Sequence, residues 1–169
     1  MYNLDLPTTM SLPHIHIPNP KHLTHVFYDV YKSILPPNID YGEDEQGASP
    51  RKGFLEHLIN TKNKRIQRIC ASDAYITNAK IDLQAAGIDL ELFSTYVRFG
   101  EGDILAPKPF KDYLEAKHIA PSNTLIIGDS AIKDIRGAIE AGCAYVHIPP
   151  YLDAQSKDDF DYTIIDDYL

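Results

Sequence analysis

The stretch TLIIGDSAIKDIRGAIEAG, residues 124–142, decides the fold class of this chain. It begins with the aliphatic run Thr124–Ile127, which is typical of a buried strand. A glycine and two polar residues end that run, and apolar residues then recur at helical spacing up to a second glycine. The pattern therefore predicts a strand, a tight turn that carries Asp129, and a helix from Ile132 to Ala141.

Strands and helices alternate in the same way on both sides of this stretch. Further strands are predicted at His25–Val30, Arg65–Ala71, Phe93–Phe99, Ala144–Ile148 and Tyr162–Ile165. Further helices are predicted from Ser49 (as N-cap, with Pro50 as first residue) to about Asn60, from Ala79 to Ala86, and from Phe110 to Lys117. This alternation predicts an α/β fold, a Rossmann-like three-layer sandwich with a mostly parallel central sheet and helices on both faces.

Residues 1–24 differ from the rest in composition, with four prolines and the alternating run His14-Ile15-His16-Ile17. We expect an extended arm with one edge strand, followed by an α/β domain over residues 25–169. His14 and His16 would face the same side of a strand, but without a nearby third ligand a metal site there is disfavoured. The polar, turn-rich residues 36–50 are predicted to form a loop.

Composition excludes several classes of function. The chain has 16 Lys and Arg against 24 Asp and Glu in 169 residues, a net charge of −8, so nucleic-acid binding is not expected. No run of 18 apolar residues and no secretory signal pattern is present, so we expect no membrane span. Cys70 and Cys143 lie in apolar surroundings and are predicted to be reduced core thiols of a cytoplasmic protein. The aspartates of the C-terminal tail are predicted to be a solvated surface.

Polar residues stand where the predicted strands end. Asp29, Ser72 and Asp129 follow three of the strands, Asp134 lies one turn after Asp129, and Lys108 lies before the Phe110 helix. Ligands of such sheets bind beyond the carboxyl ends of the strands, so these groups should converge. Three carboxylates, a hydroxyl and a lysine are the composition expected for Mg²⁺ and a phosphate group. Taken singly, each has a structural explanation, such as a helix cap for Asp134 or Ser72.

This ordered set resembles the four motifs of the haloacid dehalogenase-like (HAD) hydrolase superfamily. Residues 128–134, GDSAIKD, are similar to its fourth motif, and Lys108 in the context APKPF is similar to the third. Ser72 at a strand end is similar to the second motif, and VFYDVYKSIL, residues 26–35, resembles the first, usually written hhhDxDGTL. The resemblance covers about residues 25–169.

The resemblance implies a role for each of these positions. Asp29 would be the nucleophile that attacks phosphorus and forms an aspartyl-phosphate. Ser72 and Asp73 would contact the substrate, and Lys108 would neutralise charge on Asp29 and the phosphoryl group. Mg²⁺ would be held by Asp29, the backbone carbonyl of Tyr31, Asp129 and Asp134. The expected substrate is a phosphorylated small molecule or a phosphoprotein.

The first motif departs from the phosphatase pattern at three positions. Tyr31 stands where the family's phosphatases have a second Asp, which protonates the leaving oxygen, and Lys32 and Ser33 replace the usual Gly and Thr. A tyrosine, whose ordinary pKa is near 10, is a poor general acid at neutral pH. The pattern Asp-x-Tyr occurs in the superfamily's 2-haloacid dehalogenases, whose halide leaves without a proton.

Three functional hypotheses remain open. The first is a Mg²⁺-dependent phosphatase without a substantial cap domain, since residues 36–50 are too few for a helical cap. The second is a catalytically degenerate HAD domain that acts as a binding module. The third is a dehalogenase, although those enzymes need no metal and carry a cap. A register that places Asn3 at the nucleophile position is disfavoured, because a strand of two residues cannot anchor it.

Overall fold

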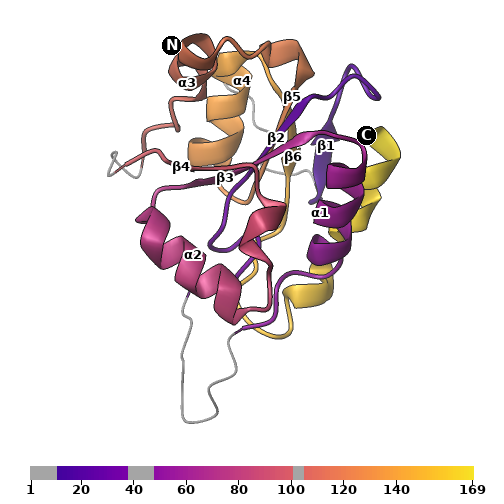
Figure 1. The fold of residues 1–169 in the computed structure, drawn as a ribbon, viewed down its shortest axis with the longest axis vertical. Coiled ribbons are helices and arrows are strands. Elements are labelled where there is room, and N and C mark those ends of the chain that lie inside the picture. The colour runs from indigo at the N-terminus through magenta and orange to yellow at the C-terminus, as the bar shows by residue number, and fades with distance from the viewer. Residues whose placement is uncertain (1–10, 38–47, 101–104) are drawn as a thin grey trace.

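The computed structural model describes residues 11–37, 48–100 and 105–169 (Figure 1). Its strands are β1 (His14–His16), β2 (His25–Tyr28), β3 (Gln67–Ser72), β4 (Thr95–Arg98), β5 (Thr124–Gly128) and β6 (Ala144–His147). Its α-helices are α1 (Phe54–Asn63), α2 (Ile76–Ala85), α3 (Phe110–Lys117) and α4 (Gly137–Ala141). A π-helical turn, η3 (Ala131–Arg136), precedes α4, and the 3₁₀ helices are η1 (Leu90–Leu92), η2 (Pro121–Asn123), η4 (Lys157–Asp159) and η5 (Tyr162–Tyr168).

The strands form one sheet in the order β1-β6-β5-β2-β3-β4. All neighbours are parallel except β1, which runs antiparallel to β6 at the edge and confirms the edge strand expected in the arm. β2 lies at the centre, with His25 in register with Thr124 of β5 and Gln67 of β3. The residues that follow β2, β3 and β5 therefore meet at one edge of the sheet.

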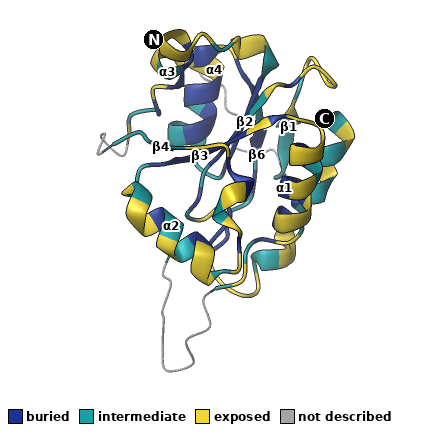
Figure 2. Ribbon diagram, viewed as in Figure 1, coloured by how far each residue is buried: buried dark blue, intermediate teal, exposed yellow. Residues whose placement is uncertain are grey.

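Helices cover both faces of the sheet, which confirms the predicted fold class (Figure 1). Tyr28 of β2 faces the core that contains Phe54 of α1 and Tyr162 of η5. Its neighbour Phe27 faces the opposite core, which is formed with Phe110 of α3 and Ala138 of α4. Adjacent residues of one strand thus belong to different cores, and the central strands β2, β3 and β5 are among the most deeply buried elements (Figure 2).

The start of α1 corrects the prediction for residues 49–53. The helix begins at Phe54 rather than at Pro50, and it is preceded by Gly53 with φ 72°. Long-range hydrogen bonds override the local N-cap pattern, because the Arg51 N–H donates to the Ile34 carbonyl and the Lys52 carbonyl accepts from Tyr162. These bonds hold the segment outside the helix.

Arg51 is also the largest fully buried side chain of the described residues. Its guanidinium carbon lies 5.5 Å from the ring centroid of Tyr151 and 5.9 Å from that of Phe160. Within the part of the chain that the structure describes, its side-chain nitrogens have no hydrogen-bond partner. Burial lowers the pKa of Arg51, with nearby acidic groups acting in the opposite direction. The guanidinium charge of Arg51 is therefore stabilised mainly by contact with the faces of the Tyr151 and Phe160 rings.

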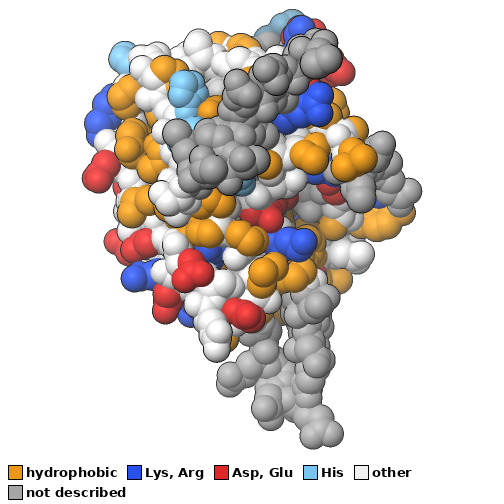
Figure 3. Space-filling model, turned by 180° about the vertical axis from the view of Figure 1, so that it is seen from behind, with side chains coloured by type: hydrophobic (Ala, Val, Ile, Leu, Met, Phe, Trp, Pro, Cys, Tyr) orange, Lys and Arg blue, Asp and Glu red, His pale blue; other side chains and the backbone are white. Residues whose placement is uncertain are grey.

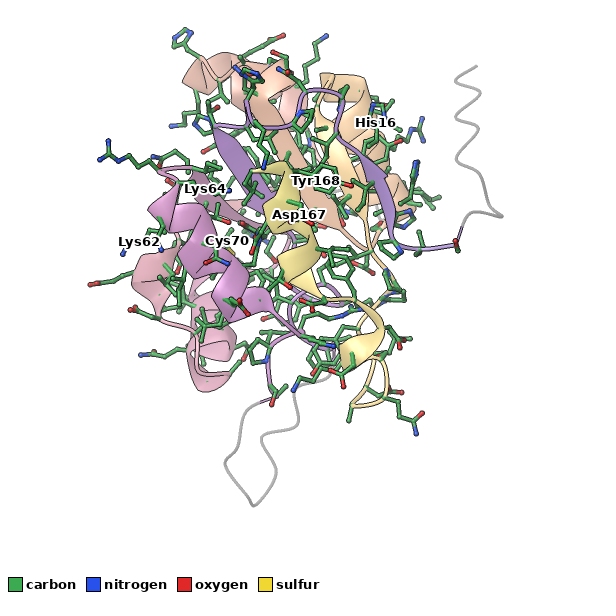
Figure 4. All side chains as sticks on the ribbon, turned by 90° about the vertical axis from the view of Figure 1, so that its right-hand side faces the viewer. His16, Lys62, Lys64, Cys70, Asp167 and Tyr168 are labelled. Atoms are coloured by element: carbon green, nitrogen blue, oxygen red, sulfur yellow. The ribbon has the colours of Figure 1, made fainter. Side chains whose placement is uncertain are left out.

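The predicted last strand, Tyr162–Ile165, is wrong, because these residues form the helix η5. Asp161 caps it by accepting a hydrogen bond from the Thr163 N–H at 2.9 Å. Its buried residues Tyr162 and Ile165 recur at helical spacing with Leu169, which follows the helix, and η5 packs beside α1. Figure 4 shows this C-terminal segment lying across the sheet beside α1.

A buried polar chain joins η5 to α1 and to β2. His57 Nδ1 lies 2.6 Å from Asp166 Oδ1, and His57 Nε2 lies 2.7 Å from the Tyr28 hydroxyl. Asn60 donates to the second oxygen of Asp166 at 2.7 Å. The prediction of a solvated acidic tail is therefore wrong for Asp166, whose carboxylate is tied into the core.

The remaining expectations concern the arm, the cysteines and the surface. The His14 and His16 rings both contact Tyr145, with centroids 5.5 and 5.0 Å away, so the pair packs around an aromatic ring. Both cysteines are free and buried, as predicted for core thiols. No helix in the described ranges has the length and hydropathy needed to cross a membrane. Acidic and basic side chains are interspersed on the face seen in Figure 3.

Candidate active site

A cleft of about 370 Å³ opens at the carboxyl edge of the sheet. The residues predicted for the site all line it: Asp29, Tyr31, Ser72, Asp73, Lys108, Asp129 and Asp134. Lys32, Ala74, Ser130 and Lys133 complete the lining. The structure therefore brings together residues that lie up to about a hundred positions apart in the sequence. The alternative register at Asn3 lies outside the described residues.

Three carboxylates converge in this cleft. Asp29, Asp129 and Asp134 each offer an oxygen, and these oxygens lie within 4.8 Å of one another. Burial, and then repulsion from Asp29, raise the pKa of Asp129 to about 8 and also raise that of Asp134. Crowded carboxylates of this kind suit a hard divalent cation, because such a cation removes the repulsion and prefers oxygen ligands.

Lys108 is the cation that the chain itself supplies to this cluster. Its Nζ lies 2.8 Å from Asp29 Oδ1 and 2.6 Å from Asp134 Oδ1, and the residue is 4% exposed. Burial alone would lower the pKa of Lys108, but Asp134 and Asp29 reverse that effect and raise it. Lys108 is therefore charged and fixed between two of the three carboxylates.

A close backbone contact sets the position of Lys108. Its N–H donates to the Lys133 carbonyl at 2.9 Å. A Cβ atom added at Gly137 would come 2.8 Å from the Lys108 carbonyl oxygen, so only glycine permits this approach. The loop of the third motif is thus docked on the turn of the fourth.

The turn of the fourth motif orients its two aspartates. A Cβ atom added at Gly128 would overlap the Asp134 side chain, so the glycine leaves the space that Asp134 occupies. Asp134 Oδ2 accepts from the Ser130 N–H at 3.2 Å, and the Asp129 carbonyl accepts from His147 Nε2 at 3.0 Å. The predicted helix from Ile132 begins as the π-helical turn η3, which carries the buried Asp134.

Ser33 is a site residue that sequence analysis did not assign. Its hydroxyl lies 2.8 Å from Asp29 Oδ2 and 3.2 Å from Asp129 Oδ1, and it accepts from the Asp129 N–H at 3.1 Å. Ser33 therefore links the first motif to the fourth. The available signal was its position in the first motif, where the resembled family has threonine.

Ser72 and Asp73 are arranged differently from each other. Ser72 Oγ accepts from the Ala74 N–H at 3.1 Å, so the hydroxyl proton remains available to donate. Asp73 Oδ2 forms an ion pair with Lys133 Nζ at 3.1 Å. A substrate contact by either residue remains a prediction.

Tyr31 and Lys32 define how the first motif departs from the phosphatase pattern. The Tyr31 hydroxyl donates to an oxygen of Asp82 on α2, so its proton is engaged by the protein. Lys32 has φ 66°, the left-handed backbone region that favours glycine, at the position where the family usually has Gly. The turn keeps its shape with a lysine, at a cost of about 1–2 kcal/mol. The Tyr31 carbonyl as a metal ligand remains a prediction.

Comparison with known proteins supports the same family. Residues 105–149, which contain Lys108, Asp129 and Asp134, match the family model described as HAD-hydrolase-like. No curated protein matches the chain.

Solved structures extend the likeness to most of the chain. A predicted phosphoglycolate phosphatase from Haemophilus somnus is 18% identical, with a TM-score of 0.60 over 85% of this chain and 96% of its own. A HAD-superfamily hydrolase from Ehrlichia chaffeensis is 21% identical, with a TM-score of 0.52 over 75% and 86%. An L-2-haloacid dehalogenase from Xanthobacter autotrophicus is 10% identical, with a TM-score of 0.55 over 73% and 76%. The resemblance to the haloacid dehalogenase-like superfamily is therefore confirmed, in sequence over residues 105–149 and in fold over most of the chain.

Proposed function

We propose that this chain is a Mg²⁺-dependent phosphatase that uses Asp29 as its nucleophile. The observation that carries the proposal is the position of the Asp29 carboxylate. It is paired with the buried Lys108 and lies within 4.8 Å of the two carboxylates of the fourth motif. A nucleophile, a fixed cation and a divalent-cation ligand set thus share one cleft, which is what phosphoryl transfer needs.

The residues of the chain divide the chemistry among them. Ser33 and Lys108 hold the two oxygens of Asp29, so the carboxylate keeps a fixed orientation toward an incoming phosphorus atom. Attack by an Asp29 oxygen forms a new P–O bond as the bond to the leaving oxygen breaks, and water then hydrolyses the aspartyl-phosphate. Asp29, Asp129 and Asp134 would hold Mg²⁺, which supplies charge neutralisation for the phosphoryl oxygens when bound.

No carboxylic acid stands beside the leaving oxygen at the position two residues after Asp29, where the family's phosphatases have one. Tyr31 occupies that place, and its proton is donated to Asp82. We therefore expect the enzyme to act best on esters whose leaving group needs no proton, and slowly on alkyl phosphates. The same observation favours the second candidate, a binding module that keeps the metal site but does not turn substrate over. A dehalogenase is less well supported, since its chemistry has no use for the clustered Asp129 and Asp134.

Hydrolysis of p-nitrophenyl phosphate tests the proposal, because p-nitrophenolate leaves without protonation. The assay compares wild type, Asp29→Asn and the exposed control Asp112→Asn, each with Mg²⁺ and with EDTA. We expect turnover that requires both Mg²⁺ and Asp29 and that Asp112→Asn retains. Equal background from wild type and Asp29→Asn, together with Mg²⁺ binding by wild type in calorimetry, would instead establish the binding module.

Restoring the missing acid gives a second test. Tyr31→Asp should raise the rate on an alkyl phosphate by roughly tenfold or more, because a carboxylic acid then stands beside the leaving oxygen. The rate on p-nitrophenyl phosphate should change much less. An unchanged alkyl phosphate rate would contradict the role assigned to this position.

A further inference from the structure

We propose that Tyr75 is a stacking platform for a flat aromatic ring in the substrate's leaving group, which rests on the proposed phosphatase function. Tyr75 is 57% exposed. It is the only Phe or Tyr classed as exposed among the residues that the structure describes. The other aromatic rings of the described chain are packed into the two cores or partly covered. An exposed aromatic ring can stack on the flat ring of a ligand, and Tyr75 follows directly after two residues that line the cleft.

The position of Tyr75 ties it to the active-site cleft. It directly precedes α2 and follows Asp73 and Ala74, which both line the cleft. The guanidinium carbon of Arg98 lies 3.9 Å from the Tyr75 ring centroid, and Arg98 Nε donates to the Asp73 carbonyl at 3.2 Å. The platform is therefore joined to the same loop that forms one wall of the cleft.

The sheet fixes the support beneath this ring. Arg98 is the last residue of β4 and pairs in register with Ser72, the last residue of β3. Its guanidinium therefore comes from the edge of the sheet at which the candidate catalytic residues gather. Stacking on Arg98 restricts the Tyr75 side chain before a ligand arrives, so less conformational entropy is lost when a second ring stacks on it.

The composition of the cleft assigns the phosphoryl group to its interior and leaves the far end of a leaving group to residues beside it. Nearly all residues of its lining carry charged or hydroxyl groups, and these suit a phosphoryl group and a cation. The lining also contains the aromatic ring of Tyr31, whose hydroxyl is bonded to Asp82. A leaving group that extends from the cleft past Asp73 and Ala74 would reach Tyr75, which follows these two residues in the chain.

Two matched esters test this inference. Benzyl phosphate and cyclohexylmethyl phosphate have similar primary alkoxide leaving groups and similar size, but only the first carries a flat ring. We expect wild type to favour benzyl phosphate in kcat/KM by about 3- to 10-fold, the range of an aromatic pair. Tyr75→Ala should bring the ratio of the two esters to about one, and Tyr75→Phe should keep it. A ratio that is equal in wild type and Tyr75→Ala would overturn the proposal.

Binding measurements separate this inference from the proposed reaction. If wild type hydrolyses neither ester, the affinities of benzylphosphonate and cyclohexylmethylphosphonate are measured by calorimetry in the presence of Mg²⁺. A preference for benzylphosphonate that Tyr75→Ala removes would support the platform even though catalysis had failed. No preference, or no binding of either phosphonate, would overturn it.

Discussion

Replacing Asp129 with asparagine should stabilise the protein in the absence of metal. Asp129 is crowded by Asp29 and Asp134, and its pKa is raised from 3.8 to about 8, first by burial and then by these two charges. The folded state therefore holds a proton on this group that the unfolded state has released at neutral pH. Asparagine carries no charge and can still bond the Ser33 hydroxyl, so the variant escapes this cost.

The shifted pKa sets the size of the effect. At pH 7, about three pH units above its ordinary pKa, an unfolded-state Asp129 is ionised while the folded-state group is still protonated. This difference lowers the free energy of unfolding by at most about 4 kcal/mol. Asp129 is only partly buried, so solvent screening reduces the expected gain to about 2 kcal/mol. For a chain of this length, that gain raises the unfolding midpoint by about 4–8 °C.

Thermal unfolding by circular dichroism in EDTA measures the gain, with Asp112→Asn as an exposed control. Because the raised pKa costs stability as pH rises, the difference between Asp129→Asn and wild type should be small at about pH 5 and largest near about pH 8. Excess Mg²⁺ should stabilise wild type and leave Asp129→Asn nearly unchanged. A variant that melts at or below wild type in EDTA would refute the crowding argument.

Three further substitutions test other parts of the structure. Arg51→Met should raise the unfolding midpoint by about 2–8 °C, because it removes a buried charge without a hydrogen-bond partner among the described residues; a fall would contradict this. Gly128→Ala should destabilise the protein by about 1–3 kcal/mol in denaturant unfolding and weaken Mg²⁺ binding in calorimetry, since its methyl group displaces Asp134; unchanged binding would count against that displacement. His57→Phe should lower the free energy of unfolding by about 2–4 kcal/mol in the same assay, because Asp166 and the Tyr28 hydroxyl lose their partner. A variant as stable as wild type would show that these buried hydrogen bonds contribute little.

Local signals were enough for several elements of the fold. The helix α3 begins and ends at the predicted residues, Phe110 and Lys117, because its apolar spacing and the prolines before it are local features. The start of α1 could not be predicted in this way. A local N-cap pattern assigns residues 50–53 to the helix. Hydrogen bonds between Arg51 and Ile34, and between Lys52 and Tyr162, keep this segment out of it. Tertiary pairing decided that boundary.

In the candidate site, too, some contacts could be predicted from the sequence and others depend on tertiary packing. That Asp29 and Asp129 approach each other followed from one rule, that parallel strands end at a common edge. For Ser33, only its position in the first motif gave a signal, and its contacts with Asp29 and Asp129 depend on where the side chain points after the turn. The bond from Tyr31 to Asp82 could not be predicted, because it depends on which helix lies opposite. Likewise, only packing against α1 revealed that Asp166 belongs to the core and not to a solvated tail.

The central position of β2 has a consequence for how the protein folds. β2 pairs with β5 across a sequence separation of 99 residues, from His25 to Thr124, so this contact closes a long loop of chain. Such contacts form late, because the entropy of closing the loop is lost before the sheet compensates for it. The carboxylates of Asp29 and Asp129 meet only after that step. A metal ion bound by both aspartates would therefore mainly lower the rate of unfolding and would change the rate of refolding little.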